Sequence, residues 1–85
     1  MDKLRAFNLG SDLLLKQIYS DLEIGIHTVN HEDGDFGIIL SHRDERYERG
    51  SEHLAIYTFH SDEEIMRTFE YMKQVIAGEV LITDE

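Results

Sequence analysis

The spacing of apolar residues changes twice along this 85-residue chain, and this change constrains the fold more than any other feature. From Leu14 to Leu22, apolar side chains recur at intervals of three and four residues, which is typical of an amphipathic helix. They then alternate with polar residues, as in strands, and the helical spacing returns after Ser61. The pattern predicts one α+β domain over residues 1–85, with the order helix, three antiparallel strands, helix (αβββα).

The first helix is expected to begin at Ser11, because a serine hydroxyl can accept hydrogen bonds from the first-turn amides. It is expected to end near Asp21. Asn8 and Gly10 are expected to interrupt any helix before Ser11, because both residues favour turns. Residues 4–9 are therefore expected to form a short strand or an irregular arm.

The next two strands are expected to form a hairpin whose register follows from the apolar pattern. The three expected strands cover residues 24–29, 36–41 and 53–59. A two-residue turn would place the apolar rows of the first two strands on opposite faces. A three-residue loop that ends at Gly34 instead pairs Thr28 with Ile38 and Ile26 with Leu40, on one face. Its third position favours a left-handed residue, and glycine stands there, so this loop is predicted.

The remaining segments complete the expected order. Residues 42–52 are almost wholly charged and are expected to form a long exposed connection. The third strand is apolar on both faces, which favours a central or doubly covered strand. In the second helix, Ser61 and Glu64 have capping-box spacing, and Gly78 is expected to end the helix. Residues 80–82 are expected to dock as a short last strand.

The charge of the chain restricts its partners. Eighteen Asp and Glu against eight Lys and Arg give a formal charge of −10. A small domain needs a magnitude of only about 2–8 for solubility. An anionic surface repels nucleic acid and attracts basic proteins, so we expect a basic protein partner and no direct nucleic-acid or membrane partner. The chain has no cysteine and no recognisable signal peptide, and a cytoplasmic location is expected.

The acidic residues gather at the hairpin loop, in the charged connection and at the start of the second helix. Each group also has an ordinary structural explanation, because loops are polar and helix N-termini favour acids. Tyr47 lies among Arg43, Arg46 and Arg49, either in a solvated loop of self-neutralising pairs or as an exposed interface anchor. The candidate partner-binding residues are Glu32, Asp33, Asp35, Asp44, Glu45, Tyr47, Glu48, Asp62, Glu63 and Glu64.

The histidines do not have the spacing of metal ligands. On a strand, His27 and His31 would lie about 13 Å apart, too far for one ion. A site formed by His42 and His53 with acids of the connection is the one metal arrangement that the pattern leaves open. We expect no metal, no cofactor and no catalytic residues, because no nucleophile and acid–base pair converge.

The αβββα order is also that of double-stranded-RNA-binding domains. Those domains carry lysine at the start of the second helix, where this chain has Asp62, Glu63 and Glu64. The order and the acidity resemble some small acidic phage inhibitors of CRISPR nucleases. This resemblance covers architecture and charge, not a sequence motif, and it implies an anti-defence role.

The sequence therefore predicts a small acidic inhibitor or adaptor, not an enzyme. It would bind a basic nucleic-acid-binding protein, such as a nuclease, by mimicking nucleic acid. The alternative is a homo-oligomeric structural or regulatory module without mimicry. A homodimer of this kind would use the sheet face that carries Gly25, His27, Val29 and Ile39.

Overall fold

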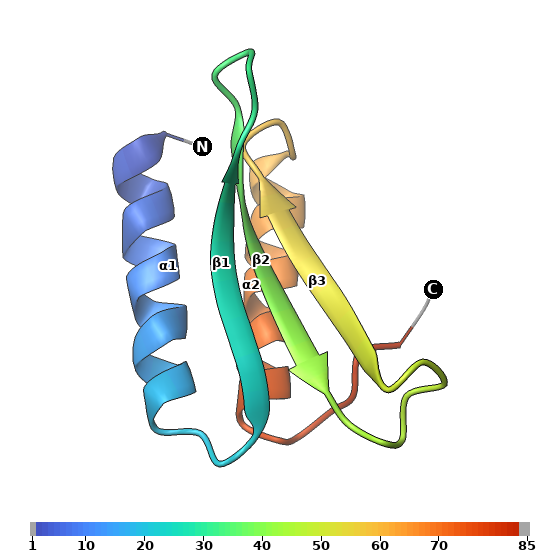
Figure 1. Cartoon of the computed structure of the whole chain (residues 1–85). Coiled ribbons are helices and arrows are strands. Elements are labelled where there is room, and N and C mark those ends of the chain that lie inside the picture. Colours follow the sequence, from blue (N-terminus) through green and yellow to red (C-terminus); the bar gives the residue numbers. More distant parts are fainter. Residues whose placement is uncertain (1, 84–85) are drawn as a thin grey trace.

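The computed structural model describes residues 2–83. Both helices lie on one face of a three-stranded antiparallel sheet, and no described residue forms a layer on the other face (Figure 1). This confirms the predicted αβββα order. Neither helix within residues 2–83 has the length and apolar character to cross a membrane. The elements are α1 (Lys3–Ile18), β1 (Glu23–Asn30), β2 (Phe36–Arg43), β3 (Ser51–Tyr57) and α2 (Asp62–Ile76).

Helix α1 begins earlier than the sequence predicts. The Asp2 side chain caps it by accepting a hydrogen bond from the Arg5 amide at 2.8 Å. The helix then continues without a break to Ile18. Residues 4–9 are therefore helical, and the predicted start at Ser11, with a strand or arm before it, is wrong.

Packing against the sheet explains why Asn8 and Gly10 do not interrupt α1. Ala6 and Leu13 are buried in the core on either side of them. A glycine inside a helix costs about 1 kcal/mol relative to alanine, whereas burial of one leucine stabilises by about 1.5–3 kcal/mol. The burial of the helix therefore outweighs the local preference against it.

The β1–β2 hairpin has the predicted register and loop. Thr28 pairs with Ile38, and the other residue pairs of β1 and β2 have the same register. The His31 amide donates to the Asp35 carbonyl oxygen at 2.7 Å, which closes a three-residue loop. Gly34 has a φ of 93°, in the left-handed region that the loop requires. Both predictions are confirmed.

The strand order is β1-β2-β3, so β3 is an edge strand. The prediction of a central or doubly covered third strand is wrong. Tyr57 of its second apolar row packs on the neighbouring strand, whereas Phe59 lies beyond the end of β3 and is exposed. The Tyr57 ring lies over Gly37 so closely that a Cβ built on Gly37 would be 2.6 Å from that ring.

The charged stretch over residues 42–52 is not one exposed connection. His42 belongs to β2 and Ser51 to β3, so only residues 44–50 form the loop between them. His42 is buried at 2% exposure, and Tyr47 is buried at 7%. The expectation of exposure is therefore wrong for both side chains.

Helix α2 has the predicted caps. The Ser61 hydroxyl accepts a hydrogen bond from the Glu64 amide at 3.1 Å. Gly78 follows the helix with a φ of 79°. Residues 80–82 form no strand, which corrects that prediction, but Ile82 is buried, so the segment does dock on the core.

Candidate functional site

The candidate acidic residues lie at two opposite ends of the sheet. The β1–β2 loop, the end of β3 and the start of α2 meet at one end, which we call the hairpin end (Figure 1). The β2–β3 loop forms the other, which we call the loop end. Three groups in the sequence thus become two surfaces. The hairpin end has Glu32, Asp33, Asp35, Asp62, Glu63 and Glu64, and the loop end has Asp44, Glu45 and Glu48.

Hydrogen bonds join the parts of the hairpin end. The Asp35 carboxylate accepts from the Thr58 hydroxyl at 2.7 Å, and the same hydroxyl accepts from the Phe36 amide at 3.2 Å. These bonds connect the hairpin loop to the turn before α2. Arg5 of α1 donates to the Asp62 carboxylate at 2.9 Å. The carboxylates of this end are therefore carried by a connected framework.

Two carboxylates of the hairpin end are exposed and accept no hydrogen bond from another described residue. These are Glu32, in the loop, and Glu63, in the first turn of α2. Asp33, by contrast, accepts from the Asp35 amide at 3.0 Å and supports the loop itself. Glu32 and Glu63 are thus the carboxylates most available to an external cation.

An aromatic cluster that the sequence analysis missed borders the hairpin end. Tyr57 and Phe59 stack with ring centroids 5.0 Å apart and an interplanar angle of 9°. His31 and His60 lie 5.6 and 5.5 Å from the Tyr57 ring. Phe59 is 60% exposed, which makes it an apolar contact beside the acids. The two-residue spacing of Tyr57 and Phe59 was the sequence signal for this cluster, although β3 ends at Tyr57 and Phe59 lies in the turn that follows.

The loop end has charges of both signs. Arg46 donates to both carboxylate oxygens of Asp44, at 2.9 and 2.7 Å. These bonds hold the pKa of the Asp44 carboxyl well below its usual range, and Asp44 raises the pKa of Arg46. The expectation of self-neutralising pairs is confirmed here, whereas Arg43 pairs with Glu23 of β1 at 3.5 Å. Asp44 is therefore occupied within the chain.

A groove of about 1420 Å³ opens at the loop end between β3, α2 and the C-terminal segment. Its charged lining is mixed, with Arg49 and Arg67 beside Glu52 and Glu70. Mixed charge gives no strong field of one sign. The hairpin end is therefore the more anionic of the two ends.

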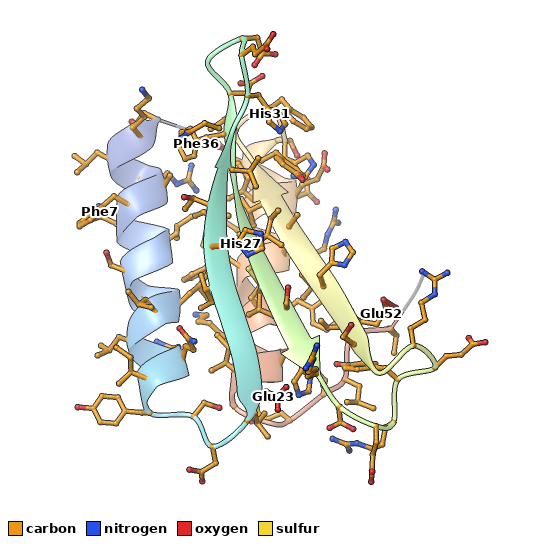
Figure 2. All side chains as sticks on the ribbon, in the orientation of Figure 1. Phe7, Glu23, His27, His31, Phe36 and Glu52 are labelled. Atoms are coloured by element: carbon orange, nitrogen blue, oxygen red, sulfur yellow. The ribbon has the colours of Figure 1, made fainter. Side chains whose placement is uncertain are left out.

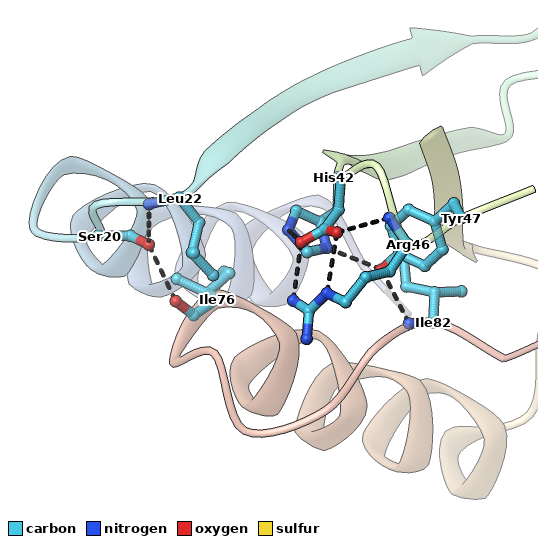
Figure 3. Close-up of polar contacts among 8 residues, drawn as sticks. Ser20, Leu22, His42, Arg46, Tyr47, Ile76 and Ile82 are labelled. Carbon is cyan, nitrogen blue, oxygen red and sulfur yellow. Dashed lines mark hydrogen bonds and ion pairs between the residues drawn. The ribbon is translucent and has the colours of Figure 1, made fainter. Parts of the chain in front are cut away.

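Tyr47 is a buried structural residue. Its hydroxyl accepts a hydrogen bond from the Ile82 amide at 2.9 Å and lies 2.7 Å from Nδ1 of His42 (Figure 3). Burial raises the pKa of the Tyr47 hydroxyl, although the bond from the Ile82 amide opposes that shift. The proposed role of Tyr47 as an exposed anchor is therefore wrong. Its ring joins the loop to the C-terminal segment.

The Tyr47 hydroxyl is also the hydrogen-bond partner of the buried His42 imidazole. A hydroxyl has one proton and two lone pairs, so it can accept from the Ile82 amide and also share a hydrogen bond with Nδ1 of His42 in either direction. Nε2 has no hydrogen-bond partner among the described residues, and the nearest Asp44 oxygen is 4.0 Å away. The alternation of buried and less buried side chains along β2 continues to His42, and this pattern was the sequence signal that His42 is buried.

The metal arrangement left open by the sequence does not form. Ser41 pairs with His53, so His42 and His53 lie on opposite faces of the sheet. Within residues 2–83, no group of three or more histidine, aspartate and glutamate side chains is placed to hold a metal ion.

The outer face of α1 is the most apolar exposed surface of the described chain. The helix buries Leu13 but leaves its neighbours Leu14 and Leu15 exposed. The spacing of Leu14, Leu15 and Ile18 predicted a helix, but it did not show that Leu13 faces the core while these three side chains face solvent. The exposed side chains at this face are Leu4, Phe7, Leu14, Leu15, Ile18 and Tyr19.

Comparison with known proteins assigns no family, since neither a family model, nor a curated protein, nor a solved structure matches the chain. The hairpin end and the outer face of α1 therefore carry the functional inference.

Proposed function

We propose that this protein is a small acidic inhibitor or adaptor, not an enzyme, that binds a basic nucleic-acid-binding protein through its hairpin end. One observation carries the proposal: the acids of the β1–β2 loop and those of the α2 N-terminus lie at the same end of the sheet. Glu32 and Glu63 there are exposed and accept no hydrogen bond within the described residues. A role as a nuclease inhibitor or phage anti-defence protein in the cytoplasm fits this chemistry.

The mechanism is occlusion of a phosphate-binding surface. Lys and Arg side chains that hold phosphate form strong, charge-assisted hydrogen bonds with carboxylates as well. The formal charge of −10 accelerates the encounter with a basic surface and repels nucleic acid from the complex. Phe59, at the border of the hairpin end, supplies an apolar contact that anchors the carboxylates.

Affinity capture tests this proposal. The chain is immobilised at low salt and exposed to a nuclease-treated host lysate, and retained proteins are eluted with DNA or RNA. We expect a basic nucleic-acid-binding protein that nucleic acid displaces and moderate salt releases, because ion pairs of exposed groups are screened by salt. Retained proteins that resist both elutions would contradict nucleic-acid mimicry.

A second candidate function is self-association as a structural or regulatory module. The exposed apolar side chains of α1 favour it, because large apolar patches on small domains usually mark interaction sites. The two functions do not exclude each other, since the hairpin end and the outer face of α1 use different residues.

A further inference from the structure

The turn between β3 and α2 holds an exposed aromatic ring in a fixed position. Phe59 stacks on Tyr57 with a centroid distance of 5.0 Å and an interplanar angle of 9°. His60 meets both rings edge-on, 5.5 Å from Tyr57 and 5.0 Å from Phe59. The Tyr57 amide donates to Nδ1 of His60 at 3.3 Å, and the His60 amide donates to the Tyr57 carbonyl oxygen at 3.0 Å. Phe59 is therefore positioned by its neighbours before any partner binds.

One face of the Phe59 ring is open to solvent, because Tyr57 covers only the other face. His60 lies at similar distances from both rings, so it borders their shared edge and does not cover Phe59. His31, beside the hairpin loop, contacts the Tyr57 ring at 5.6 Å (Figure 2). No other aromatic ring of residues 2–83 packs on Phe59. The 60% exposure of Phe59 is therefore exposure of this open face.

A carboxylate without a partner follows this ring in the chain. Glu63 lies four residues after Phe59, in the first turn of α2, and is exposed. Its neighbours Asp62 and Glu64 each accept a hydrogen bond from another side chain of the protein. Within the described part of the chain, Glu63 accepts none, so it is the carboxylate of this turn that is free for an external donor.

An aromatic face beside a free carboxylate favours a guanidinium as the occupant. Aromatic faces attract cations, and arginine occupies them more often than lysine does. A guanidinium is planar and weakly hydrated, so it can stack on a ring while it donates in its own plane to a carboxylate. A nucleotide could also stack on the ring, but a chain with a formal charge of −10 repels its phosphate. A purely apolar occupant would desolvate the carboxylate without giving it a partner.

We infer that Phe59 and Glu63 bind one arginine side chain of the basic partner. The guanidinium stacks on the open face of Phe59 and donates hydrogen bonds to the carboxylate of Glu63. This inference rests on the proposed function and names the residue that the partner presents. Arginine is also a residue with which proteins hold phosphate, so its capture removes a phosphate contact from the partner.

Two peptides of equal length and charge test the preference for arginine. Fluorescein-labelled oligoarginine and oligolysine are each titrated with the full chain at one salt concentration, and anisotropy is followed. Phe59→Leu should weaken oligoarginine binding by about two- to fivefold and oligolysine binding less, because the ring favours a guanidinium. Phe7→Leu is the matched control and should change neither, since Phe7 is 69% exposed but projects from α1 (Figure 2). Equal losses for both peptides in Phe59→Leu, or no loss, would overturn the inference.

A double-mutant cycle tests whether the ring and the carboxylate bind the same guanidinium. Phe59→Leu and Glu63→Gln are measured singly and together against oligoarginine. If one arginine contacts both groups, the combined loss of affinity should be smaller than the product of the single losses. Glu32→Gln removes the same charge from the hairpin loop, so its loss should multiply with that of Phe59→Leu. Losses of Phe59→Leu and Glu63→Gln that simply multiply would contradict a shared arginine.

Failure of this inference and failure of the proposed function give different results. If nucleic acid displaces the captured partner but Phe59→Leu binds that partner as wild type does, the mimicry stands and the arginine contact is wrong. If the wild-type chain prefers oligoarginine through Phe59 but captures no protein that nucleic acid displaces, the arginine site stands and the mimicry is wrong.

Discussion

Single side chains explain why the most charged part of the sequence packs against the core. Tyr47 lies between Arg46 and Glu48, and no local pattern distinguishes it from an exposed loop residue. Its burial depends on the amide of Ile82, which is 35 residues away in the sequence. A contact at that distance depends on the tertiary structure, so the sequence alone could not predict that Tyr47 is structural. His42 was predictable, because it continues the buried row of β2.

Tyr47→Phe should lower the free energy of unfolding by about 1–3 kcal/mol, because the variant leaves the buried Ile82 amide and Nδ1 of His42 without a partner. Urea unfolding measures the change. Tyr19→Phe is the matched control, since Tyr19 is 83% exposed, and it should change stability by less than about 0.5 kcal/mol. Equal stability of the two variants would show that the Tyr47 hydroxyl is not buried.

The raised pKa of Tyr47 predicts a loss of stability in alkali. An unfolded tyrosine ionises near pH 10, whereas the folded protein holds this proton to higher pH. The unfolded state therefore binds fewer protons above about pH 10, and stability falls as pH rises, by up to about 1.4 kcal/mol per pH unit. Urea midpoints on either side of pH 10 should differ more for wild type than for Tyr47→Phe. The same difference in both proteins would assign the effect to other groups.

At the scale of helices and strands, the sequence predicted the features that depend on local chemistry. The Gly34 loop, the β1–β2 register and the Ser61 cap all depend on residues close together in the chain. The start of α1 and the edge position of β3 depend on tertiary packing. Burial of α1 in the core keeps the helix continuous at Gly10. The Tyr57 ring packs over Gly37 of the neighbouring strand. Neither helix propensity nor the alternation of apolar residues along a strand predicts these two contacts.

Two glycine substitutions test these elements with opposite expected signs. Gly10→Ala should stabilise the fold by up to about 1 kcal/mol, because its Cβ would lie 3.6 Å from Ile38 without a clash and alanine favours a helix. Gly37→Ala should destabilise by about 1–3 kcal/mol, because its Cβ would clash with the Tyr57 ring. Thermal unfolding measures both. A neutral or destabilising Gly10→Ala would argue against a continuous α1.

At the scale of the whole molecule, the distribution of charge is more informative than its sum. The sequence predicted the acidic groups, but it could not show that two of them share one end while the third faces arginines at the other. That separation follows from the hairpin topology. Helix α1 has a net positive charge and an exposed apolar outer face. The molecule thus has an acidic hairpin end and, separate from it, an exposed apolar helix face.

Two charge-matched double variants should reveal which end binds the basic partner. Glu32→Gln with Glu63→Gln changes the hairpin end, and Glu45→Gln with Glu48→Gln changes the loop end by the same charge. The first should weaken binding of the captured protein by up to about 2 kcal/mol, because two ion-pairing carboxylates are lost. The second should retain most of the affinity. Equal losses, measured by calorimetry, would mean that only total charge matters.

Equilibrium competition tests the central claim most directly. A labelled nucleic-acid duplex is bound to the captured protein, and its fluorescence anisotropy is followed while the acidic chain is added. We predict stoichiometric release of the duplex by the wild-type chain and much weaker release by Glu32→Gln with Glu63→Gln. A ternary complex, in which the chain binds while the duplex stays in place, would contradict nucleic-acid mimicry.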